Sequence, residues 1–423
     1  MAGCEKLEEV KEQLPPPPSA KSEEESASSE PDPASMEAPV KEEFETLPIE
    51  NPVIIKNEKT LIEDFDPAEG TELILSFSYD TPKVYIEGRD EAAAKINEFT
   101  GLLSEKYYSG NAGADMDIYS PVGYDIMLQE ATDNFTYYYE NNAEGISLEY
   151  SSTQDCSVSR ADKNILSIVL HSQSYSGGAH GSYADYGYVF DTESGENLSL
   201  QDLSEDYEAL SAYLIDKMVE LAEKDEDQYY SQRIVFVTHD EYANAFRNLL
   251  RNGSWYFDSE GLVIFTLTEE FGPHAAGIVE FRIPYEELEG KIYDKYIPKS
   301  SGGKGKFEIS ALSELSDGSI EIIDKLTADE EGQELCLIAK GNVYDVSITK
   351  VSYANRFYEL GQLWYCSEMG SNALQLKAVI PEGVPDLMLK YRDAEGMEYR
   401  YLISQSGKDG SFILVNDDIE AVG

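Results

Sequence analysis

Hydrophobic and polar positions after residue 46 follow two different periods, which predicts a mixture of strands and helices. Short apolar runs predict strands at 52–55, 73–77 and 84–86. A helix is expected next, because apolar residues recur there at spacings of three and four: Ile96, Phe99, Leu103 and Tyr107. The tyrosine-rich segments 134–139 and 146–150 then predict strands of a half-buried antiparallel sheet.

The pattern starts afresh after residue 150. Residues 165–170 predict a core strand, and a long helix with one apolar face is expected after Ser204. Thr238 and Glu241 form a T-x-x-E capping box, which predicts a second helix. More strands are expected at three places: 255–257, 262–267 and 277–283. Strands and helices mix without regular βαβ alternation, so the class is predicted as α+β.

A glycine-, serine- and lysine-rich linker is the clearest boundary in the chain. Beyond it, short strands and turns without a helix signal predict a small β-sandwich. The fold is therefore expected to have antiparallel sheets with packed helices in a two-part module, followed by an all-β sandwich-like domain. The expected parts are a disordered acidic and proline-rich tether (1–46), two α+β modules (47–150 and 151–297), the linker (298–306) and the sandwich-like domain (307–423).

Charge narrows the classes of partner. The 423 residues carry 82 acidic and 32 basic side chains, a formal net charge of −50. Nucleic acid is an unfavourable partner, because phosphates are bound by basic patches. A cationic partner would be attracted at long range, whereas solubility alone is the simpler explanation of the charge.

The cysteines suggest a location rather than a metal site. Cys4 lies in M-A-G-C, which resembles the end of a bacterial lipobox, so we expect a lipidated Cys4 after removal of a leader. The membrane would then be reached only through this N-terminal anchor, at the surface of a Gram-positive bacterium. Cys336 and Cys366 are expected either to pair or to be two buried free thiols.

Residues 174–203 contain the sharpest local feature, a G-G-A-H turn between two strands. Gly177 and Gly178 allow positive φ or close backbone approach. His180 would project from this turn among tyrosines, either as part of an aromatic recognition loop or as a residue that fixes the turn by hydrogen bonds. The candidate binding residues are Tyr175, Gly177, Gly178, His180, Tyr183 and Tyr186.

Catalytic and cofactor motifs do not emerge from the sequence. The four histidines form no H-E-x-x-H motif, and no Walker loop, G-x-S-x-G elbow or dinucleotide fingerprint occurs. We therefore expect no metal site, no cofactor, no catalytic residues and a protein that is not an enzyme. A glycan-acting enzyme with a carboxylate pair and a purely structural envelope protein are the alternatives.

Two ordered signatures carry a family resemblance. The first comprises the G-G-A-H turn, an aromatic strand ending in F-D, and L-Q-D-L at 200–203. The second comprises W-Y-F at 255–257, G-P-H-A-A-G at 272–277 and I-P-Y-E-E-L at 283–288. Residues 47–297 thereby resemble the ectodomain of RsiV-type lysozyme-sensing anti-sigma factors, a module that also accompanies peptidoglycan deacetylases.

The resemblance implies an extracytoplasmic, lipoprotein-type binding module. The family can bind lysozyme, so lysozyme, another cationic protein or peptidoglycan is the partner that the resemblance implies. This chain departs from the anti-sigma factors, which have a membrane span and a sigma-binding segment, and from the deacetylases, which add a metal-binding catalytic domain. Neither sigma-factor signalling nor deacetylation is therefore expected of it.

Overall fold

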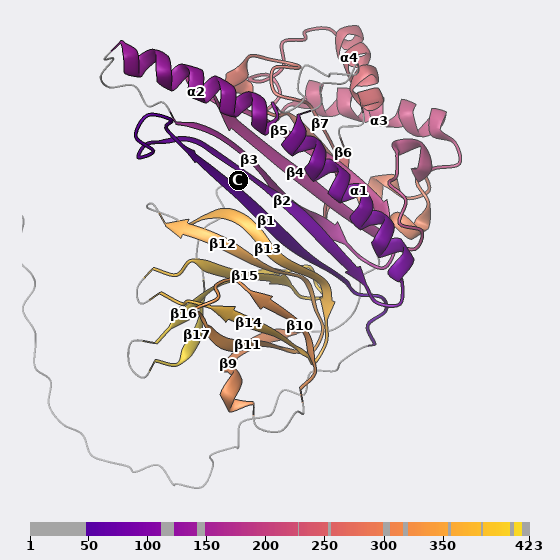
Figure 1. Ribbon diagram of the computed structural model, residues 1–423. Coiled ribbons are helices and arrows are strands. Elements are labelled where there is room, and N and C mark those ends of the chain that lie inside the picture. The colour runs from indigo at the N-terminus through magenta and orange to yellow at the C-terminus, as the bar shows by residue number, and fades with distance from the viewer. Residues whose placement is uncertain are drawn as a thin grey trace, which may run out of the picture. The chain divides into compact units, whose positions relative to one another are not determined.

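A ten-stranded sheet runs through the part of the chain that the computed structural model describes (Figure 1). The described residues are 48–110, 122–141, 149–226, 228–252, 255–298, 305–315, 320–353, 357–381, 384–406 and 410–416. The strand order is β17-β16-β15-β12-β13-β1-β2-β3-β4-β5. Neighbouring strands are antiparallel, except that β2 and β3 pair in parallel. The first five strands are β1 (Val53–Phe65), β2 (Leu73–Ile86), β3 (Tyr150–Ala161), β4 (Ile165–Tyr175) and β5 (Ser182–Asp191).

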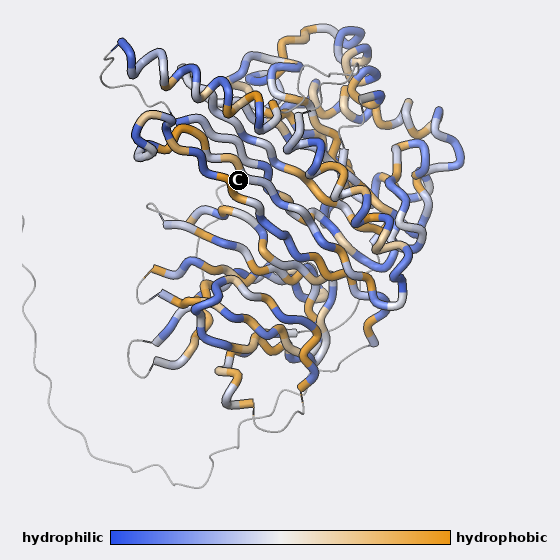
Figure 2. Tube along the Cα trace, in the orientation of Figure 1, coloured by the Kyte–Doolittle hydropathy of each residue, from blue (hydrophilic) through white to orange (hydrophobic). Residues whose placement is uncertain are grey.

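Helix α1 (Asp90–Ser109) covers one face of these strands (Figure 1). It contains the predicted apolar face: Ile96 and Tyr107 are buried, and Phe99 and Leu103 pack against the core as partly buried residues. Figure 2 shows hydrophobic and hydrophilic positions interleaved along α1 and along the strands. No helix among the described residues combines the length and apolar character needed to cross a membrane.

Helix α2 (Tyr124–Glu140) corrects the expectation of a strand at 134–139. Tyrosine favours strands, but the packing decides here, because Met127, Ala131 and Phe135 recur every four residues and are buried on one helical face. Met127, Ala131 and Phe135 contact a cluster that includes Phe77 of β2. Of the other strand predicted nearby, residues 146–148 lie outside the described residues, and Tyr150 begins β3.

The segment after β5 forms a second packed layer of helices and a small sheet. Its α-helices are α3 (Tyr207–Lys224), α4 (His239–Asn252) and α5 (Tyr285–Leu288), and its sheet has the order β6 (Trp255–Phe257), β7 (Gly261–Phe265) and β8 (Glu280–Pro284). The 3₁₀ helices are η1 (Leu200–Leu203), η2 (His274–Ala276) and η3 (Asp294–Tyr296). The capping box is confirmed: the Thr238 N–H donates to Glu241 Oε2 (2.9 Å) and the Glu241 N–H to Thr238 Oγ1 (3.3 Å).

The C-terminal region is an all-β sandwich, as predicted. A four-stranded sheet of order β10-β14-β11-β9 packs against β12, β13, β15 and β16 of the large sheet through a shared apolar core. Trp364, Leu374 and Leu389 belong to that core. Cys336 and Cys366 are buried free thiols, the second of the two alternatives. The bounds are β9 (Lys306–Ala311), η4 (Leu312–Glu314), β10 (Ile322–Thr327), β11 (Gln333–Lys340), β12 (Val343–Tyr353), β13 (Phe357–Met369), β14 (Ala373–Ala378), β15 (Leu387–Arg392), β16 (Glu398–Gln405) and β17 (Phe412–Asn416).

Strands from before and after the predicted linker (298–306) belong to one sheet, because β1 pairs with β13. That ladder is short, from Ile54↔Cys366 to Lys56↔Trp364. Where it ends, Asn57 donates both to the Cys156 carbonyl (2.7 Å) and to the Gln362 carbonyl (2.6 Å). The half-buried Asn57 amide thus bonds backbone carbonyl groups of β3 and β13 that the short ladder leaves unpaired.

Gly187 of β5 allows the second layer to approach the large sheet closely. A Cβ atom at this position would lie 2.2 Å from the Trp255 carbonyl oxygen. Beside it, the Phe257 N–H donates to Ser167 Oγ of β4 (3.0 Å). A side chain at position 187 would therefore push β6 away from the sheet.

Replacing Gly187 by alanine should lower the free energy of unfolding by about 1–3 kcal/mol, because the new methyl group overlaps backbone atoms that cannot rotate away. Urea denaturation followed by circular dichroism measures this change. Gly101→Ala is the matched control: it lies inside α1 with nothing within 4 Å of the added Cβ. That variant should gain about 0.5–1 kcal/mol. Equal stability of Gly187→Ala and the unmodified protein would contradict the close-approach account.

Candidate functional site

The β4–β5 hairpin carries the G-G-A-H turn. Gly177 and Gly178 have φ of +85° and +104°, so the predicted left-handed backbone is present at both glycines. The hydroxyl of Tyr175 donates to the Gly178 carbonyl (3.0 Å) and closes the turn from inside. Tyr175 is half-buried, whereas His180 is exposed. The glycines and Tyr175 therefore shape the turn, and His180 projects from it.

The His180 ring stacks on His274, a residue of the second sequence signature. Their ring centroids are 4.2 Å apart with an interplanar angle of 24°. Tyr183 approaches His274 edge-on, with centroids 5.6 Å apart, and is 36% exposed. His180 also lies 3.4 Å from the Gly181 carbonyl through Nδ1. We call the rings of His180, Tyr183 and His274 the histidine surface.

Contacts from the segment between β7 and β8 hold the histidine surface in place. Thr268 Oγ1 donates to the Tyr183 carbonyl (2.6 Å). Gly277 has a φ of +71°, and a Cβ there would meet the Tyr183 hydroxyl at 2.9 Å. Glu269 pairs with His274 Nδ1 (3.4 Å). The segment that follows β7 is thus fitted to β5, which fixes the rings relative to one another.

Not every candidate residue reaches this surface. Tyr186 is half-buried and packs against the core under α1, because it points to the opposite face of β5 from Tyr183. Cys4 lies outside the described residues. His274 escaped the sequence prediction, although it lies within the G-P-H-A-A-G signature and that motif was the signal that could have identified it.

A second polar arrangement crosses the neighbouring strands β3, β4 and β5. His171 Nε2 lies 2.8 Å from Ser157 Oγ, and His171 Nδ1 lies 2.9 Å from Asp185 Oδ1. These are the distances of a Ser-His-Asp triad. No sequence motif marks this triad, because its residues come together only through strand register, with His171 directly opposite Asp185. We call Ser157, His171 and Asp185 the β3–β5 triad.

The backbone N–H groups that flank Ser157 are not free to stabilise an oxyanion. Cleavage of an ester or amide needs hydrogen-bond donors aimed at the oxyanion, and backbone N–H groups often supply them. The Cys156 N–H is bound to Asp80 Oδ2 (3.0 Å) and the Val158 N–H to Gln362 Oε1 (3.0 Å). Ser157 therefore sits in mid-strand between two N–H groups that are already engaged.

Electrostatics instead favour a protonated imidazole at the centre of the triad. Burial acts to lower the pKa of His171, but the hydrogen bond and charge of Asp185 and the nearby charges of Asp155 and Glu280 raise it above its usual value. Glu280 itself accepts a hydrogen bond from Tyr256 (3.0 Å). Among the described residues, no group of three or more histidine, cysteine or acidic side chains is arranged to hold a metal ion.

The raised pKa of His171 makes stability depend on pH. His171 binds its proton more tightly in the folded chain than in the unfolded chain, where the value is near 6.5. Its stabilising contribution is therefore complete below that value and is lost as the pH rises through the higher folded value. His171→Gln should remove this pH dependence. The change in the free energy of unfolding should be less than about 1 kcal/mol, because the side chain is 42% exposed and screened by solvent.

Urea unfolding of the unmodified chain and the variant at about pH 5.5 and about pH 8.5 measures the effect of His171. Ser172→Ala is the control, since it removes a non-titrating side chain that bonds Gln154 (3.0 Å) on the other face of the same strand. It should change stability equally at both pH values. An unchanged pH slope in His171→Gln would show that the assigned charge is wrong.

Two family models match consecutive regions of the chain, and each region contributes residues to the histidine surface. Residues 69–183 match the family described as Deacetylase PdaC, and residues 200–286 match the family described as Protein of unknown function (DUF3298). His180 and Tyr183 thus lie in the first matched region and His274 in the second. A search of curated proteins returns no relative of the chain.

Two solved structures of DUF3298 family members resemble the chain. One, from Bacteroides fragilis, is 18% identical with a TM-score of 0.40, covering 57% of this chain and 94% of its own. The other, from Pseudomonas aeruginosa, is 18% identical with a TM-score of 0.36, covering 58% and 97% respectively. The chain therefore contains a region similar to the PdaC family followed by a region similar to the DUF3298 family.

Proposed function

We propose that this chain is an extracytoplasmic, non-catalytic binding module whose partner is a cationic protein of the lysozyme class. The observation that carries the proposal is the stacked contact between His180 and His274. It joins two separate segments into one exposed aromatic surface with Tyr183. Aromatic side chains are enriched in protein interfaces, and a surface that is already fixed loses little conformational entropy when a partner binds.

Charge supports a cationic partner. The net charge of −50 attracts a positive protein over distances beyond direct contact and accelerates association at low salt. Glu269 is 58% exposed beside His274 and adds a carboxylate at the edge of the histidine surface. The partner would therefore meet aromatic rings at the centre of the interface and negative charge around them.

The resemblance to an ectodomain supports a position outside the cytoplasm. A lipid on Cys4 would hold the folded part at the cell surface of a Gram-positive bacterium, with residues 5–46 as the tether. Cys156, Cys336 and Cys366 are buried, so they are shielded from oxidation in that environment. This anchored arrangement would place the histidine surface where secreted cationic proteins arrive.

A hydrolase is the second candidate, and the distances in the β3–β5 triad favour it. The engaged N–H groups on both sides of Ser157 argue against it. An assay of wall-glycan and ester hydrolysis with the unmodified chain and Ser157→Ala separates the two candidates. Hydrolysis that disappears in the variant would replace the binding proposal with an enzyme.

Titration of the whole chain with lysozyme by calorimetry should detect binding that weakens between about 20 mM and about 150 mM salt, because screening shortens the reach of the charges. Tyr183→Ala should weaken binding about tenfold, the effect of losing about 1.4 kcal/mol at a buried aromatic contact. His180→Ala should have a similar effect, since it removes half of the stacked pair.

Tyr353→Ala is the control for these variants. Tyr353 is an exposed tyrosine at the end of β12, outside both regions that match known families, and its loss should leave the affinity unchanged. Absence of binding at both salt concentrations would refute the lysozyme-class partner. Binding that neither Tyr183→Ala nor His180→Ala weakens would refute the histidine surface as the site.

A further inference from the structure

Two tyrosine rings lie parallel where helix α1 ends and helix α2 begins. The ring centroids of Tyr108 and Tyr124 are 5.3 Å apart, and the interplanar angle is 13°. Tyr108 is 36% exposed and Tyr124 is half-buried, so dissolved molecules reach the pair. Parallel rings at this distance need only small side-chain rotations to bring their edges into contact. The pair is therefore placed so that a covalent bond could join the two rings.

The backbone holds this pair together. Gly110, with a φ of +62°, follows α1, and Gly123 precedes α2. A Cβ atom at Gly123 would lie 2.5 Å from the Ser109 carbonyl oxygen, so only a residue without a side chain fits there. The two helix ends thus touch through their backbones directly beside the tyrosines. The stacked pair follows from this contact and not from the free rotation of two surface side chains.

A carboxylate is ready to take a proton from one ring of the pair. The Tyr124 hydroxyl donates to Asp64 Oδ2 of β1 (2.9 Å). Burial, this hydrogen bond and the neighbouring charges raise the pKa of Tyr124 to about 12, so the ring keeps its proton at neutral pH. A phenol that loses an electron becomes a strong acid. Asp64 can then accept the proton along a hydrogen bond that already exists.

A second parallel pair, Tyr391 and Tyr399, lies between β15 and β16 and differs in two respects. Its centroids are 5.0 Å apart at 15°, and Tyr399 also donates to a carboxylate, Asp393 Oδ2 (3.1 Å). However, Tyr391 is only 2% exposed, and the strand ladder places the two residues directly opposite each other. Solvent therefore reaches this pair from one side only, and the ladder restricts both backbones.

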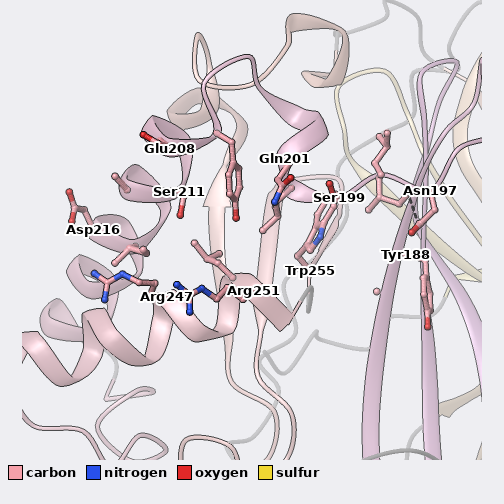
Figure 3. A pocket seen from close by; sticks show the side chains of 18 residues that line it. Tyr188, Asn197, Ser199, Gln201, Glu208, Ser211, Asp216, Arg247, Arg251 and Trp255 are labelled. Atoms are coloured by element: carbon pink, nitrogen blue, oxygen red, sulfur yellow. Dashed lines mark hydrogen bonds between the residues drawn. The ribbon is translucent and has the colours of Figure 1, made fainter. Parts of the chain in front are cut away.

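Other tyrosines lack a phenol partner for such a bond. Figure 3 shows one of them, Tyr188, at the edge of a groove between β5, η1, α3 and α4. Its ring meets Phe99 at 67°, with centroids 5.7 Å apart. Phenylalanine has no hydroxyl group to lose a proton, so this contact cannot react in the same way.

We propose that Tyr108 and Tyr124 form an oxidative crosslinking site, at which a peroxidase with hydrogen peroxide converts the pair to dityrosine. The bond would fasten the last turn of α1 to the first turn of α2. An oxidant of this class would be met at the extracytoplasmic position proposed above. The chemistry itself depends neither on that position nor on a lysozyme-class partner.

The reaction balances as follows in atoms and electrons. Each ring gives up one electron and its phenolic proton, Tyr124 to Asp64 and Tyr108 to water. The two phenoxyl radicals couple by a carbon–carbon bond between ring carbons next to the hydroxyl groups. Each of these carbons then loses its hydrogen as a proton, and each oxygen regains a proton. Overall, two hydrogen atoms leave the pair and reduce one molecule of hydrogen peroxide to two of water.

Oxidation of the whole folded chain with a haem peroxidase and hydrogen peroxide tests the proposal, at a protein concentration low enough to avoid coupling between molecules. Cleavage after acidic residues then separates the two tyrosines, because Asp115 and Asp117 lie between them in the sequence. Mass spectrometry should find the two peptides joined, with the loss of two hydrogen atoms. Fragmentation should assign the bond to Tyr108 and Tyr124. Absence of this bond, or a bond mainly between Tyr391 and Tyr399, would overturn the proposal.

Matched variants separate the pair from other tyrosines. Tyr124→Phe should abolish the crosslink, whereas Tyr399→Phe, the same change in the other parallel pair, should leave its yield unchanged. Gly123→Ala should lower the yield although both phenols remain, because it separates the helix ends. A yield that Tyr124→Phe and Tyr399→Phe reduce equally would exclude the stacked pair as the site.

The roles of Asp64 and of the fold have their own readouts. Asp64→Asn should slow the appearance of dityrosine fluorescence by up to about a hundredfold, the lower end of what a positioned base contributes. An unchanged rate would show that Asp64 does not take the proton. Oxidation in urea should give less of the crosslink, since unfolding separates the helix ends. Equal yields with and without urea would show that the folded geometry does not direct the coupling.

Discussion

The close approach of β6 to β5 at Gly187 is the contact on which the position of the second layer depends. Only a residue without a Cβ lets the Trp255 carbonyl come this near the strand. The same docking brings Ser167 Oγ to the Phe257 N–H and places buried Arg160 against Tyr285 (2.7 Å). With this layer fixed, His274 stacks on His180. The contact between β5 and β6, which belong to different sheets, therefore fixes the layer that carries His274 against the large sheet.

A continuous sheet connects this docking to the rest of the described chain. The β1–β13 ladder is short, and Asn57 extends it by bonding carbonyl groups of two neighbouring strands. These two hydrogen bonds favour one register, because a slip of the strands would break both of them. The C-terminal sandwich thereby shares its sheet with the PdaC-like region, and both belong to one compact unit.

Elements that depend on residues close together in the chain could be predicted from the sequence. The face of α1, the capping box at Thr238 and the glycine turn at 177–178 could all be identified from neighbouring residues. The prediction of a strand at 134–139 was wrong because it followed the strand propensity of tyrosine, whereas the four-residue spacing of buried side chains stabilises helix α2. Strand register and the docking at Gly187 join distant residues, so the contacts His180–His274 and His171–Asp185 had no local signal.

The turn around His180 and the segment around His274 are proposed to form one surface for a cationic protein. Hydrogen–deuterium exchange of the whole chain, with and without lysozyme, distinguishes this surface from any other. Binding should slow exchange in residues 176–183 and 268–277 together, because both segments would lie under the same partner. Slower exchange confined to other parts of the chain, or in only one of these segments, would contradict it.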